Sequence, residues 1–137
     1  MKKKTSRLPE ALLALLSLIG LVGLFTFMAP CGMHDDGAWS SCHWAGQALK
    51  GLFCVMTAGA LLACVLPASA RAGAVLAMVP AAALAAVLPG TLISLCMMGS
   101  MRCNLIMKPA ALVLGIIIAA AALAEGLRLL RRKEPAA

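Results

Sequence analysis

Residues 12–28 read LLALLSLIGLVGLFTFM, a stretch that contains no charged side chain. A helix needs about 20 apolar residues to cross the hydrocarbon core of a bilayer. Similar apolar stretches follow at about residues 48–66, 73–95 and 110–127. Only helices and closed barrels span lipid, because every backbone polar group there needs an internal hydrogen bond. The sequence therefore predicts an all-α, four-helix transmembrane bundle made of two helical hairpins.

The composition indicates a membrane environment as well. The 137 residues are 63% hydrophobic and 12% charged, with a mean hydropathy of +0.98, whereas soluble domains carry about 25% charged residues. We expect a single integral membrane domain over residues 1–137, with outer turns at about 29–47 and 96–109. No charged residue falls at the middle of a predicted span, which argues against a stand-alone ion-coupled transporter.

The 12 basic residues are distributed unevenly between the two sides of the predicted bundle. Those near the chain ends and in the turn after the second span are Lys2, Lys3, Lys4, Arg7, Arg71, Arg128, Arg131, Arg132 and Lys133. Only Lys50, Arg102 and Lys108 fall on the other side. Basic residues are enriched in cytoplasmic segments, so both termini are predicted to be cytoplasmic. The net charge of +7 then indicates contact with the lipid bilayer and not with nucleic acid.

Proline interrupts the third apolar stretch at Pro80 and at Pro89. Proline lacks a backbone donor and clashes with the preceding helical turn, so both residues are expected to bend this span. Pro89 and Gly90 stand a short distance before Cys96 and could shape a pocket beside it.

Four cysteines bracket the two outer turns. Cys31 and Cys42 enclose the first turn, and Cys96 and Cys103 enclose the second. Cysteines in an oxidising compartment form disulfides, and four of them allow three pairings. Pairing within a turn would close a small loop and contribute about 2–4 kcal/mol, whereas pairing between turns would join the hairpins. Aligning the two halves as a duplicated hairpin would set Cys31 against Cys96 and Cys42 against Cys103. The sequence leaves this connectivity open.

The other two cysteines, Cys54 and Cys64, lie inside the second span. Their separation corresponds to about 280° around a helix, so they do not share one face. We interpret both as small apolar packing residues.

Three functions are compatible with the cysteine-rich outer turns, and we favour a structural one. Disulfides would stabilise a cap that a protein partner, or a second copy of the chain, recognises. On this interpretation the protein is a non-enzymatic accessory or interaction subunit of a membrane or envelope complex.

The second function is thiol–disulfide exchange by Cys31, Cys42, Cys96 and Cys103. A cysteine pair in each outer turn of four spans is similar to the DsbB type of enzyme, which oxidises partner thiols and passes electrons to a quinone. Neither pair has the Cys-X-X-Cys spacing that lowers the pKa of one thiol.

The third function is binding of a soft metal ion. Thiolate, thioether and imidazole ligands together suit Cu(I). The candidate ligands are Cys31, His34, Cys42, His43, Cys96, Met101 and Cys103. Their spacing matches no compact zinc or copper motif, and metal would compete with disulfides for the same sulfurs.

Two short elements carry a family resemblance. Cys42-His43-Trp44-Ala45-Gly46-Gln47 after Pro30-Cys31, and Met101-Arg102-Cys103 before Pro109, resemble the DUF4418 family of small bacterial and archaeal membrane proteins. The resemblance covers the whole chain and implies four spans, a bacterial or archaeal cell membrane, and the outer cysteines as a set. Family members often carry Met where Ser40 and Ser41 stand here. The resemblance implies no activity.

Overall fold

The computed structural model of the chain describes residues 7–133. Within that range the fold is all-α, as predicted: α1 (Leu8–Phe25), α2 (Ser41–Val65), α3 (Ala68–Val87) and α4 (Lys108–Lys133). Four helical segments are long and apolar enough to cross a membrane. The chain is therefore a multi-pass membrane protein. Lys2, Lys3 and Lys4, which enter the predicted charge bias, lie outside the described residues.

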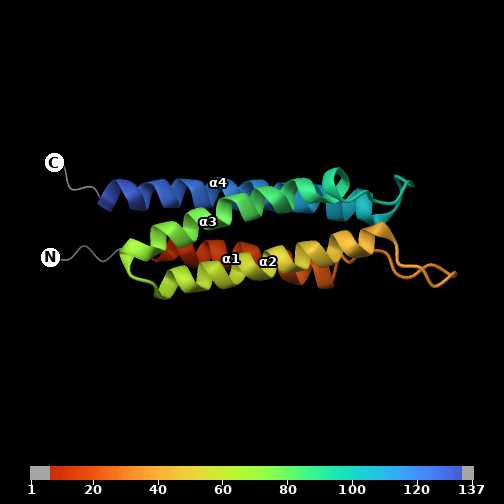
Figure 1. Ribbon diagram of the computed structural model, residues 1–137, viewed down its shortest axis with the longest axis horizontal. Helices are drawn as coiled ribbons and strands as arrows, with labels where there is room; N and C mark the ends of the chain where they lie inside the picture. The colour runs from red at the N-terminus through yellow and green to blue at the C-terminus, as the bar shows by residue number, and fades with distance from the viewer. Residues whose placement is uncertain (1–6, 134–137) are drawn as a thin grey trace.

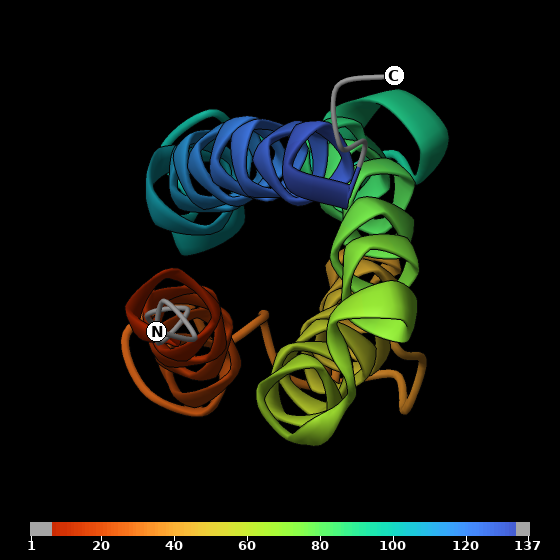
Figure 2. The ribbon, with the colours of Figure 1, turned by 90° about the vertical axis from the view of Figure 1, so that its left-hand side faces the viewer.

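The helices lie side by side along the long axis of the molecule (Figure 1). Viewed along that axis, α1, α2, α3 and α4 follow one another around the bundle (Figure 2), with the most extensive contacts between α3 and α4 and the next between α1 and α2. The two predicted helical hairpins are thus confirmed. We call the end formed by residues 26–47 and 88–109 the cap end, and the opposite end, where α1 begins and α4 finishes, the terminal end.

The helices of the second hairpin approach each other closely at Gly115 of α4. A Cβ atom on Gly115 would lie 2.7 Å from the carbonyl oxygen of Ala82 and 2.7 Å from the Cβ of Ala86. Small residues let membrane helices pack backbone against backbone, which is the main source of cohesion where lipid removes the hydrophobic driving force. This contact explains how the Ala-rich α3 packs so closely on α4.

A buried ion pair joins α1 to α3 near the terminal end. Arg71 Nη1 lies 3.4 Å from Glu10 Oε1, with side-chain exposures of 4% and 0%. The sequence placed Arg71 among the basic residues of one side of the bundle, but it did not predict the pairing of Arg71 with Glu10. A second ion pair joins two residues of α4, with Arg128 Nη1 3.3 Å from Glu125 Oε2.

Two helix ends differ from the predicted spans in a way that matters for the cysteines. The first span was expected to reach residue 28, but α1 ends at Phe25 and the next residues turn back, with the Met28 N–H donating to the Gly23 carbonyl at 2.7 Å. The second span was expected to start near residue 48, but α2 begins at Ser41. Cys42 consequently lies in the first turn of a helix, which fixes its position better than a loop would.

The two prolines of the third span behave differently. Pro80 lies inside α3, which continues as a helix to Val87. At Pro89 and Gly90 the backbone leaves the helical conformation, and Gly90 takes a φ of 87°, which favours glycine. The wide turn Leu88–Leu92 closes when the Ile93 N–H donates to the Leu88 carbonyl at 3.1 Å. The expected bend at Pro89 therefore ends α3 and directs the chain toward Cys96.

Candidate functional site

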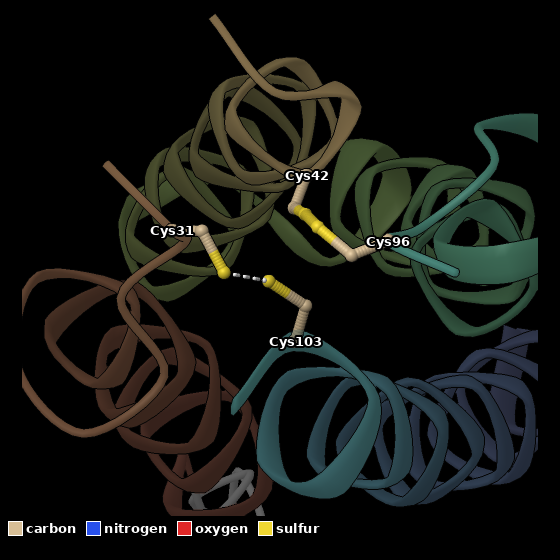
Figure 3. A group of neighbouring side chains, drawn as sticks. All are labelled: Cys31, Cys42, Cys96 and Cys103. Atoms are coloured by element: carbon tan, nitrogen blue, oxygen red, sulfur yellow. Dashed lines mark hydrogen bonds between the residues drawn. A yellow bond between two sulfur atoms is a disulfide. The ribbon is translucent and has the colours of Figure 1, made fainter. Parts of the chain in front are cut away.

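Four cysteine side chains meet at the cap end of the bundle (Figure 3). The Sγ atoms of Cys31, Cys42, Cys96 and Cys103 all lie within 4.8 Å of one another. Cys42 and Cys96 form a disulfide, with a Cα–Cα distance of 6.4 Å. Cys31 and Cys103 are free thiols whose sulfurs are 2.9 Å apart. We call this group the four-cysteine cluster.

Both close pairs run between turns and not within them. Cys42, at the start of α2, pairs with Cys96 in the loop that follows α3, and Cys31, after α1, faces Cys103 at the start of the last span. Aligning the two halves would set Cys31 against Cys96 and Cys42 against Cys103, whereas the observed pairs are Cys42 with Cys96 and Cys31 with Cys103 (Figure 3). Each pair therefore connects the first hairpin to the second.

Two contacts hold Cys31 beside Cys42. Pro30 packs against Gly46 of α2, where an added Cβ would lie only 2.8 Å from the proline Cγ. The Ser40 hydroxyl donates to the Cys31 carbonyl at 3.5 Å. Because Gly46 lies one turn beyond Cys42, its missing side chain lets the loop lie directly on α2. Pro30 and Gly46 belong to the sequence elements that carried the family resemblance.

Asn104 ties the second loop to the start of the last span. Its side-chain amide donates to the Cys96 carbonyl at 2.8 Å and to the Met98 carbonyl at 3.2 Å. These bonds fix Cys96 relative to Cys103, the residue before Asn104. Asn104 was not among the residues predicted from the sequence. The available signal was a lone amide side chain at the start of an apolar stretch, because such a side chain needs a hydrogen-bond partner when it leaves water.

Each of the two pairs consists of one buried cysteine and one cysteine that solvent can partly reach. Cys42 and Cys103 are fully buried, whereas Cys31 and Cys96 are half-buried. Cys96 also lines a surface pocket of about 440 Å³. The pocket walls include His34, Trp39, Leu95, Met97, Met98 and Met101. A molecule in this pocket would meet Cys96 before any other member of the cluster.

The predicted histidine ligands do not join the sulfurs. Among the residues that the structure describes, the four ligand atoms that converge at the cap end all belong to cysteines, and neither histidine contributes one. His34 lies on the pocket wall near Met101. The His43 ring stacks on Trp39, with centroids 4.1 Å apart, and meets the edge of Trp44 at 5.5 Å. Both tryptophans thus pack around His43.

The remaining cysteines lie outside the cluster. Cys54 is exposed on α2 and Cys64 is half-buried. The interpretation of Cys54 as a packing residue is therefore wrong for this chain, because its side of the helix faces away from the bundle.

A second, mostly apolar pocket lies far from the cluster. This pocket, of about 380 Å³, opens between α1 and α4 and includes Pro9, Leu12, Leu13 and Arg128. Pro9 lies in the first turn of α1, and Cys31 follows the other end of this helix, whose 18 residues span about 27 Å at 1.5 Å per residue. A quinone in this pocket would therefore not contact the sulfurs of the cluster.

A family model described as "Domain of unknown function (DUF4418)" matches residues 13–127. The match spans all four cysteines of the cluster and parts of all four helices. Comparisons with curated proteins and with solved structures returned no match.

Proposed function

We propose that this chain, which belongs to the DUF4418 family, exchanges disulfides with partner proteins at its four-cysteine cluster. The main support for this proposal is that all four sulfurs lie within 4.8 Å of one another. A disulfide that only stabilises a loop needs no other sulfur near it. Exchange needs a further thiol within reach of the disulfide bond, because a thiolate must attack one of its sulfurs. Convergence therefore favours exchange over the purely structural cap.

The first half of the reaction would oxidise a partner that carries two thiols. A partner thiolate attacks the accessible Cys96 sulfur, the Cys42–Cys96 bond breaks, and Cys42 leaves as a thiolate. The partner's second thiolate then attacks the partner sulfur of this mixed disulfide, and Cys96 leaves. The partner loses two electrons and two protons, and Cys42 and Cys96 become a dithiol.

The second half would pass the electrons to a protein disulfide. Cys31 attacks the acceptor disulfide, and Cys103 then attacks the Cys31 sulfur, so that a Cys31–Cys103 bond forms and the acceptor is reduced. Exchange inside the cluster restores the Cys42–Cys96 disulfide and the Cys31/Cys103 dithiol. The half-buried members, Cys96 and Cys31, thus face the donor and the acceptor, while the buried members resolve the mixed disulfides.

The charge bias of the sequence supports an extracytoplasmic position for the cap end, in the cell membrane of a bacterium or archaeon. That compartment is the one in which disulfides persist. The donor and the acceptor are then membrane or envelope proteins with reactive cysteines.

Trapping of mixed disulfides tests this proposal. A peptide that contains a disulfide is added to the detergent-purified full chain carrying Cys103→Ser. Because Cys31 then lacks its resolving sulfur, the mixed disulfide between the peptide and Cys31 should accumulate. Mass spectrometry of non-reduced peptides would identify the adduct. Cys54→Ser, outside the cluster, should not increase the amount of mixed disulfide on Cys31.

The opposite result is equally clear. If peptides with two thiols leave the Cys42–Cys96 disulfide intact and no adduct forms on Cys31, the cluster has only a structural role. The accessory-subunit function predicted from the sequence would then be the better description.

A further inference from the structure

We infer that the fully reduced four-cysteine cluster binds one thiophilic d¹⁰ cation of the Zn²⁺ class through four thiolates. The inference builds on the proposed function, because a donor dithiol would produce this reduced state. Zinc binds cysteine sulfur at about 2.3 Å in tetrahedral sites, which sets the sulfurs about 3.8 Å apart. The sulfurs of this chain already lie within 4.8 Å of one another.

Only small side-chain movements separate the observed cluster from such a site. The sulfurs of Cys31 and Cys103 lie 2.9 Å apart and would open by about 1 Å to reach tetrahedral spacing. Once reduced, Cys42 and Cys96 can separate by rotation about their side-chain bonds, since their Cα atoms are 6.4 Å apart. Asn104 and Gly46 hold the neighbouring backbone and need not move.

The burial of the cluster favours a closed, four-ligand site. Cys42 and Cys103 are fully buried and the other two are half-buried, as in structural zinc sites that keep no open coordination position. Four converging thiolates repel one another, and a divalent cation relieves that repulsion. The ligand set differs from the mixed Cu(I) set predicted from the sequence, because His34 and His43 do not belong to this group.

Metal binding and disulfide exchange would exclude each other. Binding of one cation to four thiols releases up to four protons, and the occupied thiolates cannot attack a disulfide. Conversely, each disulfide formed in the cluster consumes two thiolates, passes two electrons to the partner disulfide, and removes two ligands. The cation would therefore act as a regulator that holds the reduced cluster inactive until the cation dissociates, after which the freed thiolates can attack a protein disulfide.

Cobalt titration of the full chain tests the inference. The protein in detergent is reduced with a phosphine, freed of metal, and titrated with Co²⁺, which reports tetrahedral thiolate coordination by its visible absorption. We expect about one equivalent of Co²⁺, displaced by Zn²⁺. Cys31→Ser and Cys96→Ser should each weaken binding at least about tenfold, since even outer-shell losses cost 10–100-fold.

The controls separate this inference from the proposed exchange. Cys54→Ser and Cys64→Ser should bind Co²⁺ like the parent chain, and circular dichroism checks that each variant keeps its helices. Equal binding by the cluster variants, or none by the parent, would overturn the inference. Because a phosphine reduces the cluster chemically, Co²⁺ binding without peptide exchange would refute only the proposed function. Peptide exchange without Co²⁺ binding would refute only the metal site.

Discussion

The Sγ atoms of Cys31 and Cys103 lie 2.9 Å apart, although the residues are separated by 72 positions in the chain. They meet beside the Cys42–Cys96 disulfide because the loops after α1 and α3 both turn inward across the cap end (Figure 3). Closure of this second pair would join the two hairpins at a second point. The positions of the loops, and not the local spacing of the cysteines, decide which sulfurs meet.

Peptide mapping of the non-reduced protein should find Cys42 linked to Cys96. Mild oxidation should add a Cys31–Cys103 link, because these thiols are already in contact. Cys54, exposed on α2, should stay available to an alkylating reagent. Recovery of a peptide linked between Cys31 and Cys42 as the main product would contradict the observed arrangement.

Replacement of Gly46 by alanine should displace the first loop from α2. The new methyl group would lie 2.8 Å from the Pro30 ring, and overpacking of this kind costs about 1–3 kcal/mol. We expect slower oxidative closure of Cys31–Cys103 and a lower Tm in detergent.

The matched control is Gly51→Ala on the same helix. Among the described residues, nothing lies within 4 Å of a Cβ at that position, and alanine favours a helix over glycine. Gly51→Ala should leave the closure rate unchanged. Equal slowing by both variants would mean that the Pro30 contact does not position Cys31.

The substitution Glu10→Met should destabilise the bundle strongly. It leaves the Arg71 guanidinium buried at 4% exposure without the carboxylate that lies 3.4 Å away. Breaking a buried pair from one side costs about 3–5 kcal/mol. Chemical unfolding in detergent, followed by circular dichroism, would measure the loss.

Two further variants identify the cause of that loss. Glu10→Met combined with Arg71→Met should recover most of the stability, because apolar side chains of similar size replace a buried pair well. Arg128→Met, whose side chain is 53% exposed beside Glu125, should cost less than about 1 kcal/mol. A double variant as unstable as Glu10→Met would show that packing, and not the unpaired charge, dominates.

Asn104→Ala should make the Cys42–Cys96 disulfide easier to reduce. The variant loses the donors to the Cys96 and Met98 carbonyls, so the loop that carries Cys96 is no longer held against the last span. A thiol-reduction time course, followed by alkylation and mass spectrometry, should show a several-fold higher rate. Arg102→Ala, at an exposed neighbouring position, should change the rate little, and a matching increase there would contradict the role assigned to Asn104.

The helices were predictable because the bilayer leaves few alternatives. Residues 12–28 and 110–127 are apolar stretches whose backbone can satisfy its hydrogen bonds in lipid only as helix. Pro89 and Gly90 were predicted to bend a span that reaches residue 95, but the helix ends at Val87, since these two residues leave the helical conformation. The start of α2 at Ser41 was not predictable from hydropathy, because its first turn is polar and faces the cap.

The site was predictable only as a set of cysteines. The sequence by itself determined that Cys31, Cys42, Cys96 and Cys103 belong to the two turns on one side of the membrane, because the apolar stretches force that topology. Their convergence within 4.8 Å depends on how the helices pack and how the loops cross the bundle end. Pro30 on Gly46 and the Asn104 bonds to the Cys96 loop act between distant segments. Only the tertiary structure could decide these contacts, because residues that touch across two helices are not related by any fixed separation in the sequence.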